Sequence, residues 1–361
     1  AESPFNPVDS LVFSTLAYLN YEASPCLPPS PAGRVLLHDV VMLSDWDALS
    51  FGSWMEDAKD TSSFLRALSS SRRMRDVRVA FYANEVSEAV EKQFSAVTLS
   101  FPVTQGEAFY LAFRGTDGSF AGWKEDFNMA FQYPVPAQQL AADYVTRVAR
   151  LWQGDLVLLG HSKGGNLAVY AALQAGDDVL PRIRRVYSLD GPGFPADVVA
   201  GDRYRAVADR IVKIIPDSSI VGMILDSPEH CVVVKSNEYG PMQHLAFSWQ
   251  VDRDRFVTVP EVSVTSREFK RSLDRMLNEM TPEQLERAVD AMFKVLAASD
   301  EHGLIGLMEA GPKTIPAMLG AFAGLTDEER QHILEAAGIL LKASFPLPWQ
   351  SATPPASRTA R

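Results

Sequence analysis

Cysteine, positive charge and long apolar runs are all scarce in this sequence. With two cysteines, Cys26 and Cys231, in 361 residues, the chain has too few thiols for a disulfide framework, so we expect reduced thiols and a cytoplasmic location. A formal net charge of −11 argues against nucleic acid as a partner, because phosphate binding needs a basic surface. No apolar run reaches the length of about 18 residues that a membrane-spanning helix needs, so we expect no membrane span.

The N-terminus and the metal-binding residue types exclude two further classes. The apolar stretch at residues 11–19 has no basic segment before it, so we do not expect it to act as a signal peptide. The chain begins at Ala1 and not at methionine, so the expected cytoplasmic location applies to the given residues alone. No cluster of histidine, cysteine and carboxylate residues has the spacing of metal ligands, and neither a metal nor a cofactor is expected.

The residues that are present, 47% apolar and 22% charged, are typical of a globular chain and fall into four parts. Residues 1–75 are expected to form a helical and loop-rich segment packed on the core. In residues 76–260, aromatic and β-branched runs come first, followed by alternating strand and helix patterns. This pattern predicts an α/β fold with a mostly parallel sheet and helices on both faces. Residues 261–345 are expected to form a helical subdomain, with helices starting after Thr281 and Thr326, and residues 346–361 a disordered tail.

One short stretch, GHSKG at residues 160–164, carries the strongest chemical signal. It follows a buried strand at residues 155–160 and precedes an alanine-rich helix. A chain that turns from strand to helix this sharply needs glycine at Gly160 and Gly164, where a side chain would collide with the neighbouring element. The turn would present Ser162 at the carboxyl end of the sheet, above a helix N-terminus. Ser162 is therefore the candidate nucleophile.

A serine nucleophile needs a histidine base. In α/β folds with this strand–turn–helix, the histidine follows the serine in the sequence. Of six histidines, His38 precedes Ser162, and His161 is expected to point away from the tip of the turn. The histidines at positions 302 and 332 lie in the predicted helical region. His230 and His244 flank the last predicted strand. His244 is preferred, because the loop after that strand reaches back over the carboxyl edge of the sheet.

The acid that orients the base should end a strand between the serine and the histidine. Asp217 and Asp190 both do so. Asp217 is preferred because its strand is the neighbour of the strand that leads to His244. Asp190 is the alternative, although it also suits a turn before Gly191, and Asp226 is less favoured.

Two backbone N–H groups are expected to form the oxyanion hole. One belongs to Lys163, directly after the nucleophile, and the other to Thr116, in the loop after the strand at residues 108–113. Gly115 would allow the backbone of this loop to approach closely.

The segments FRGT, GWKEDFN and GHSKGGNLAVYAA resemble the class 3 lipases of the α/β-hydrolase superfamily. The sequence looks closer still to a bacterial branch of unknown function, the Mbeg-like family. That match rests on DSLVFSTLAYLNYE, GHSKGGNLAVYAA, IIPDSSIVGMIL and VVVKSNEYGPMQHLAFSW, and it covers roughly residues 8–250. The resemblance implies Ser162 as the nucleophile, Asp217 and His244 as its partners, and Thr116 in the oxyanion hole.

One departure from the lipase pattern bears on the substrate. Class 3 lipases usually have leucine where this chain has Lys163, so a substrate more polar or anionic than a triglyceride is expected, unless the lysine is a solvated residue of the first helical turn. The stretch with Trp123, Asp126 and Phe127 matches the lipase segment that supports the site or begins a lid. The methionines of the C-terminal region either line an acyl channel or, more commonly, pack its helices (Met276, Met280, Met292, Met308 and Met318).

Together these features predict a serine hydrolase that cleaves a small-molecule acyl ester. An amidase or a thioesterase would use the same three residues. A binding module on the hydrolase fold, with a triad that no longer reacts, is the alternative outside enzymes.

Overall fold

The structure is a computed structural model that describes residues 4–27, 30, 32–50, 58–87, 92–102, 107–117, 120–299 and 311–344. Its centre is a sheet of eight strands, built from runs of β-branched and aromatic residues that favour extended backbone. The strands are β1 (Val35–Leu36), β2 (Arg78–Ser87), β3 (Lys92–Pro102), β4 (Glu107–Phe113), β5 (Asp155–His161), β6 (Ile183–Leu189), β7 (Ile211–Pro216) and β8 (Cys231–Val234).

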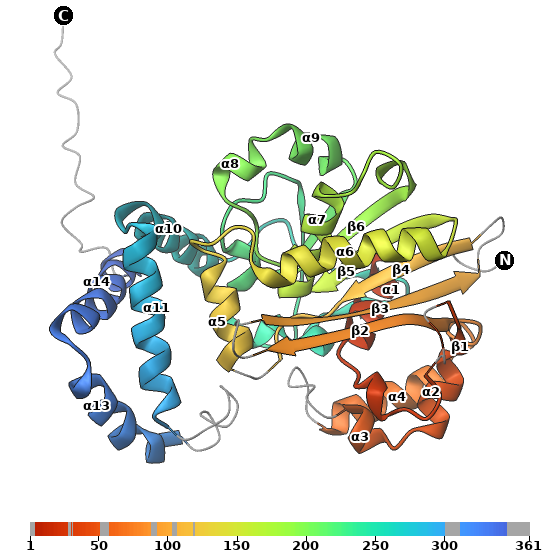
Figure 1. Cartoon of the computed structure of the whole chain (residues 1–361), viewed down its shortest axis with the longest axis horizontal. Helices are drawn as coiled ribbons and strands as arrows, with labels where there is room; N and C mark the ends of the chain where they lie inside the picture. Colours follow the sequence, from red (N-terminus) through yellow and green to blue (C-terminus); the bar gives the residue numbers. More distant parts are fainter. Residues whose placement is uncertain are drawn as a thin grey trace, which may run out of the picture.

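The strands lie in the sheet in chain order, from β1 at one edge to β8 at the other (Figure 1). The pairs from β1 to β4 are antiparallel, and those from β4 to β8 are parallel. The parallel strands place their carboxyl ends along one edge. Residues that follow β4, β5 and β6 therefore meet there, although they are far apart in the sequence.

Helices cover one face of the sheet with an apolar stripe. In α6 (Pro136–Leu151) the buried residues Ala137, Ala141, Tyr144 and Val148 recur at helical spacing. Helix α7 (Lys163–Leu173) is buried along its whole length, because it packs against β4, β5 and β6. The short helices α8 (Ala196–Val199) and α9 (Asp202–Ala208) complete this layer.

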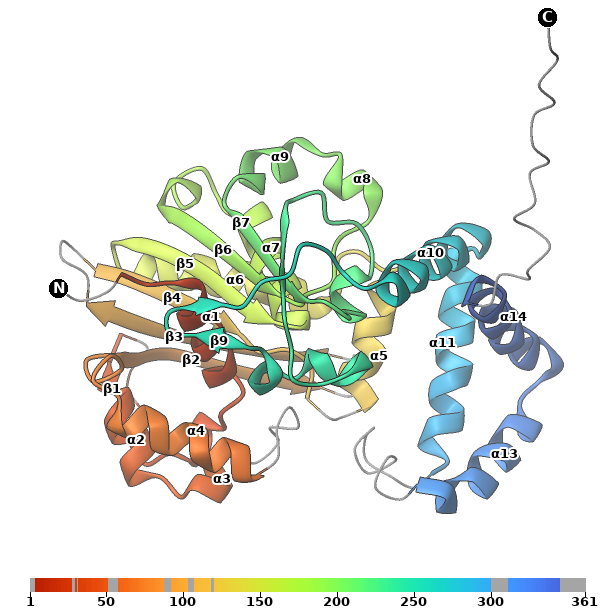
Figure 2. The same cartoon turned by 180° about the vertical axis from the view of Figure 1, so that it is seen from behind.

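The N-terminal segment covers the other face, as the reverse view shows (Figure 2). Helix α1 (Pro7–Leu16) starts at Asn6, whose side chain accepts hydrogen bonds from two N–H groups of the first turn, and it packs on β4, β5 and β6. Helices α2 (Leu37–Leu43), α3 (Trp46–Ser50) and α4 (Ala58–Ser70) follow. The expectation of helices and loops alone in this segment missed β1, which pairs with β2.

The C-terminal helices stand beside the sheet (Figure 1). They are α10 (Val264–Glu279), α11 (Pro282–Ala297), α13 (Ile315–Gly324) and α14 (Asp327–Ser344), after a short hairpin of β9 (Val251–Asp252) and β10 (Arg255–Phe256). The predicted capping box at Thr281 is confirmed, since its hydroxyl and the Gln284 side chain each bind the other residue's N–H. The same exchange joins Thr326 to Glu329. The predicted tail at 346–361 lies outside the described residues.

This architecture, with a largely parallel sheet, helices on both faces and a sharp turn after a central strand, is the α/β-hydrolase fold. The predicted fold class is confirmed, including the helical C-terminal region.

Candidate active site

The predicted strand–turn–helix is present between β5 and α7, with Ser162 at its tip. Ser162 has φ 60° and ψ −135°, a conformation that non-glycine residues rarely adopt and that persists only where the surroundings enforce it. Its N–H donates to the carbonyl of Leu189 at 2.9 Å, and its own carbonyl accepts from Gly165 at 2.9 Å. Both backbone groups of the serine are thus held by neighbouring elements.

Two glycines allow this turn, as the sequence predicted. A Cβ on Gly160 would lie 2.2 Å from the carbonyl carbon and oxygen of Gly164, and a Cβ on Gly164 would lie 2.1 Å from the carbonyl oxygen of Phe113. These distances are far below van der Waals contact with backbone atoms. Any larger residue would therefore push α7 away from β4 and β5.

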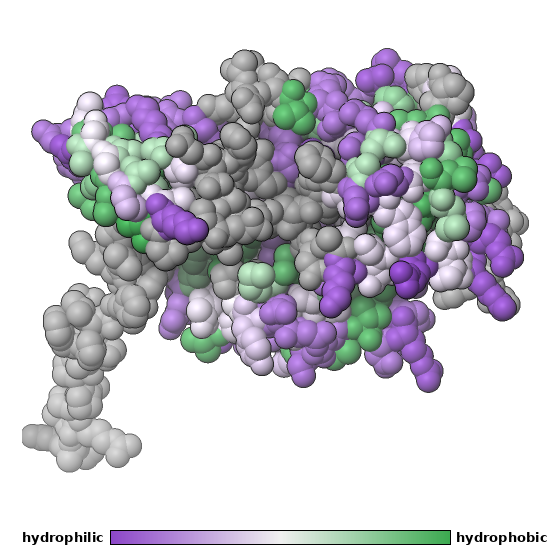
Figure 3. All heavy atoms as spheres, turned by 90° about the horizontal axis from the view of Figure 1, so that it is seen from below, coloured by the Kyte–Doolittle hydropathy of each residue, from purple (hydrophilic) through white to green (hydrophobic). Residues whose placement is uncertain are grey.

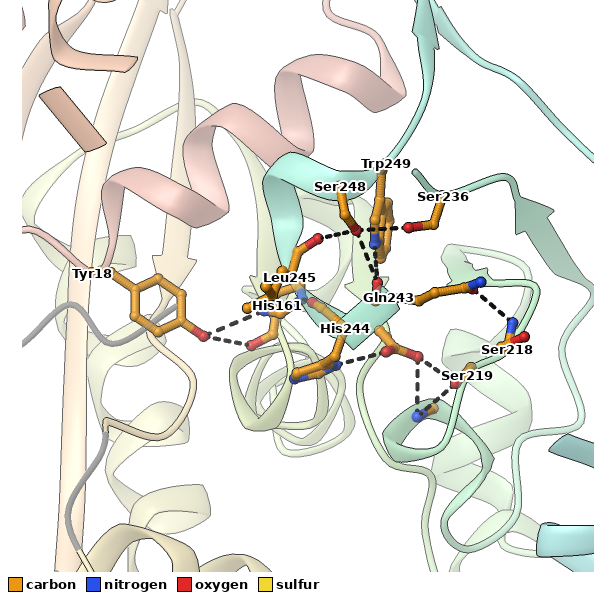
Figure 4. Close-up of polar contacts among 12 residues, drawn as sticks. Tyr18, His161, Ser218, Ser219, Ser236, Gln243, His244, Leu245, Ser248 and Trp249 are labelled. Carbon is orange, nitrogen blue, oxygen red and sulfur yellow. Dashed lines mark hydrogen bonds and ion pairs between the residues drawn. The ribbon is translucent and has the colours of Figure 1, made fainter. Parts of the chain in front are cut away.

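His244 meets an acid, but the acid is Asp190 and not the expected Asp217. His244 ends the short 3-10 helix Gly240–His244 in the loop after β8, and its Nδ1 lies 2.6 Å from Oδ2 of Asp190. Figure 4 shows the imidazole of His244 within this group of polar contacts. Asp190 follows β6 directly, with φ 48°. The prediction that Asp217 contacts the base is therefore corrected to its alternative, Asp190.

The rest of the Asp190 carboxylate is also fully engaged. Oδ1 accepts hydrogen bonds from the hydroxyl of Ser219 and from the N–H of Gly222, the latter at 3.1 Å. Burial alone would raise the pKa of Asp190. The hydrogen bond from His244, the charge of His244 and the hydrogen bond from Ser219 together hold this pKa below its usual value. Asp190 is thus an ionised carboxylate in a buried place, suited to hold an imidazole.

Asp217 and His230 have other places. The N–H of Asp217 donates to Val234, and its carbonyl accepts from Ser263 at 2.6 Å, so the residue fastens the end of β7 to the segment that leads into α10. His230 is exposed and lies at the amino end of β8, whereas the serine turn lies at the carboxyl end of β5. Among the described residues, His244 is hydrogen-bonded to Asp190 and His161, and to neither Asp217 nor His230.

The loop after β4 lies against Ser162, where the oxyanion hole was expected. A Cβ on Gly115 would lie 3.0 Å from the Cβ of Ser162 and 2.7 Å from the carbonyl oxygen of His161. The hydroxyl of Thr116 donates to Oδ2 of Asp126 in α5 (Phe120–Asn128). That bond directs the hydroxyl proton toward α5, so the hydroxyl of Thr116 does not donate toward Ser162.

The side chain of Lys163 is neither solvated nor presented to a substrate, which corrects the expectation from the sequence. It is 1% exposed, and its Nζ donates to Oε2 of Glu125 at 2.9 Å and to two oxygens of Gln93 at 3.2 and 3.3 Å. Glu125 accepts further bonds from the N–H groups of Gln93 and Ala137. This buried cluster ties the first residue of α7 to α5, β3 and the start of α6.

Helix α5 joins the site to the C-terminal helices. Lys124 forms an ion pair with Asp290 of α11 at 2.7 Å, and the ring of Phe127 meets that of Phe293 edge-on at 5.9 Å. Asp126 belongs to the same helix and accepts the hydrogen bond of Thr116. Burial raises the pKa of Asp126 to about 6.

Two of the methionines of the C-terminal region pack helices, which is one of the two roles expected for them. Met280 is buried with Leu285 and Ala288, and Met276 packs against that cluster, so these two pack helices. Met292 and Met318 are half-buried, and position 308 lies outside the described residues.

His161 is the residue of this site that the sequence reasoning missed. It was expected to point away from the turn, but its ring lies 4.6 Å from that of His244, centroid to centroid, and its Nε2 is 2.9 Å from the carbonyl oxygen of His244. Its place directly before Ser162 was the signal that could have found it.

Two general properties of the described residues bear on the site. No group of three or more histidine, cysteine or carboxylate residues among them could hold a metal ion. Within the same ranges, no helix is long and apolar enough to cross a membrane.

Comparisons with known proteins complete this picture. A structure described as the crystal structure of M37 lipase is 15% identical to this chain, with 61% of this chain and 69% of that one covered and a TM-score of 0.40. No curated protein matches the sequence. The family model described as Mbeg1-like matches residues 68–294, which span the sheet from the end of α4, the serine turn, His244 and most of α11. The chain therefore belongs to the Mbeg1-like family.

Proposed function

We propose that this protein is a serine hydrolase that cleaves a carboxylic ester. Ser162 Oγ attacks the ester carbonyl, and Nε2 of His244 takes the serine proton and passes it to the leaving alcohol. Water, activated by the same imidazole, then attacks the acyl-enzyme and releases the acid. Asp190 keeps the proton on Nδ1 of His244, which leaves Nε2 as the base, and it stabilises the imidazolium that forms.

The oxyanion of the tetrahedral intermediate would be held by backbone N–H groups. Lys163 is the first residue of α7, where N–H groups have no acceptor inside the helix and the helix dipole favours negative charge. Thr116 comes from the loop that Gly115 brings against Ser162. Donors fixed in this way cost no rearrangement during the reaction.

One observation carries this proposal: His244 Nδ1 lies 2.6 Å from a buried carboxylate, and the carbonyl of His244 contacts His161, the residue directly before a serine held in a strained turn. A binding module has no need to keep a histidine tautomer fixed or to hold a serine at φ 60°. The chain order of serine, acid and histidine is that of the α/β-hydrolases.

For the substrate we propose a small ester presented as single molecules. Phe127 of α5 is 43% exposed, but Lys124, three positions before it on the same helix, places an ion pair with Asp290 near this ring. On the face shown in Figure 3, hydrophilic and hydrophobic residues are interspersed over the described part of the surface. Binding to an emulsion would favour a continuous apolar patch.

The experiment is labelling with a fluorophosphonate probe together with hydrolysis of p-nitrophenyl butyrate. The wild type should form an adduct at Ser162, and Ser162→Ala should lose the adduct and at least about a thousandfold in kcat. Ser10→Ala, which removes another buried hydroxyl from α1, is the matched control and should keep both. A folded wild type without adduct or turnover would make the protein a binding module.

Two further measurements define the bond and the physical state of the substrate. Matched butyryl ester, thioester and anilide substrates should show the highest kcat/KM for the ester, and a higher value for either of the others would reassign the reaction. The rate on a partly soluble ester should saturate below its solubility limit. A sharp rise as the emulsion forms would show that the substrate is aggregated lipid.

A further inference from the structure

His161 connects the three parts of the site that the reaction must keep in register. It is the last residue of β5, directly before Ser162, and it is buried. Its Nε2 lies 2.9 Å from the main-chain carbonyl of His244, and its Nδ1 lies 3.4 Å from the hydroxyl of Tyr18, just after α1 (Figure 4). One imidazole therefore spans from the nucleophile turn to the loop of the base and to the N-terminal segment.

The contacts of His161 define its protonation. A carbonyl oxygen only accepts hydrogen bonds, so the atom that faces His244 must be an N–H, and the tautomer carries its proton on Nε2. Burial, and then repulsion from a charged His244, lower the pKa of His161 to about 3, so the ring is neutral. Its bare Nδ1 is an acceptor for the hydroxyl of Tyr18, whose own pKa burial raises above its usual value.

These bonds fix His244 at two separate points. Asp190 holds the ring through Nδ1, and His161 holds the main chain through the carbonyl. The ring of Trp249 packs on His161 edge-on, at 6.1 Å between centroids, and limits its movement. With ring and backbone both held, the remaining nitrogen of His244, Nε2, has a defined position beside the strand that ends at the serine turn.

The neutral state of His161 also affects how readily His244 can accept a proton. The centroids of the two imidazole rings are 4.6 Å apart. A positive charge on His161 at that distance would oppose the proton that His244 must accept during the attack. A neutral donor such as this one orients the base without lowering its proton affinity through charge.

We propose that His161 is a positioning residue that holds the main chain of His244 in register with Ser162. This inference rests on the proposed function, because it assigns a role within the same site. Tyr18 supports it by binding the nitrogen that does not face His244.

The test compares His161→Leu, which removes the donor, with His161→Gln, which keeps an N–H near the place of Nε2. His161→Leu should lower kcat on p-nitrophenyl butyrate by on the order of 100-fold with KM changed less than about twofold, because a displaced base affects the chemical step. His161→Gln should recover at least about a tenth of wild-type kcat. The matched control, His332→Leu, removes a buried histidine of α14 far from the site and should keep wild-type kcat. Equal kcat in the wild type and His161→Leu, or equal losses in the two His161 variants, would overturn the proposal.

A spectroscopic measurement covers the case in which His161→Leu does not fold or the wild type does not turn over. In ¹⁵N-labelled wild type, the imidazole of His161 should show the Nε2–H tautomer and remain untitrated down to about pH 4. The Nδ1–H proton of His244 should be protected from exchange in the wild type and in His161→Gln. Titration of His161 above pH 5, or an Nδ1–H tautomer, would overturn the inference. An inactive wild type with the expected spectrum would instead refute the esterase proposal alone.

Discussion

Nδ1 of His244 and Oδ2 of Asp190 lie 2.6 Å apart, although 54 positions separate the two residues in the chain. The other oxygen of the carboxylate is held by Ser219 and Gly222, so Asp190 cannot turn away from the imidazole without losing both bonds. The relationship assigns the orientation of the His244 imidazole to the residue that follows β6, one strand closer to β5 and Ser162 than β7 is.

The first prediction separates Asp190 from Asp217. Asp190→Asn should lower kcat for p-nitrophenyl butyrate by on the order of 10⁴-fold, because the amide favours the wrong tautomer of His244. Asp217→Asn should keep kcat within about threefold, since Asp217 binds its neighbours through backbone atoms. Thermal unfolding of both variants checks that they are folded. A large loss in Asp217→Asn with little change in Asp190→Asn would return the role to Asp217.

The second prediction concerns Asp126, whose pKa burial raises from 3.8 to about 6 against the opposing effects of Lys163 and Thr116. The folded state binds this proton more tightly than the unfolded chain does, so ionisation of Asp126 between about pH 4 and pH 6 costs folding free energy. The stability of the wild type relative to Asp126→Asn should therefore fall by roughly 1–3 kcal/mol as pH rises from 4 to 7. Urea unfolding at both pH values measures it, and a difference that stays constant would contradict the buried position.

The third prediction concerns His161, whose pKa burial lowers from 6.5 to about 3. Below pH 6.5 the unfolded chain takes up a proton that the folded state does not, so this residue makes the protein less stable as pH falls toward 3. Between pH 5.5 and 4 the slope from this group is about 1.4 kcal/mol per pH unit. His161→Gln should have a free energy of unfolding that depends less on pH in this range, whatever its stability at pH 7. An unchanged slope would show that His161 is charged in the folded protein.

The fourth prediction concerns the buried ion pair of Lys163 and Glu125. Lys163→Leu should destabilise the protein by about 3–5 kcal/mol, because it leaves a buried carboxylate without its cation. The double variant with Glu125→Gln should recover a large part of that loss, since position 125 then carries no charge that needs the lysine. Urea unfolding of the two single variants and the double variant gives the coupling. Additive effects would mean that the two side chains do not interact.

The turn around Ser162 could be predicted because it is a local device. Strand, glycines, serine and helix lie within about 20 consecutive residues, and the reason for each glycine is a collision between adjacent elements. The parallel part of the sheet could be predicted equally well, since each strand is an almost continuous apolar run bounded by turn residues.

The contacts that the sequence did not reveal depend on how loops fold back over the sheet. Asp190 and Asp217 end adjacent strands, and strand order alone does not say which of them the loop of His244 crosses. Lys163 has the usual position of a solvated first-turn residue, and it is buried because α5 and β3 pack around it. The two-residue strand β1 is too short to show an alternating pattern.

The contacts between α5 and α11 bear on how this protein can be divided. Lys124 and Phe127 of α5 bind Asp290 and Phe293 of α11, and one turn of the same helix carries the carboxylate that holds Thr116. The smallest fragment that keeps all contacts of the candidate site is therefore longer than the sheet and its covering helices. A chain shortened before α10 would remove the partners that Lys124 and Phe127 have in α11, so we expect the loop with Thr116 to depend on the helical region after residue 260.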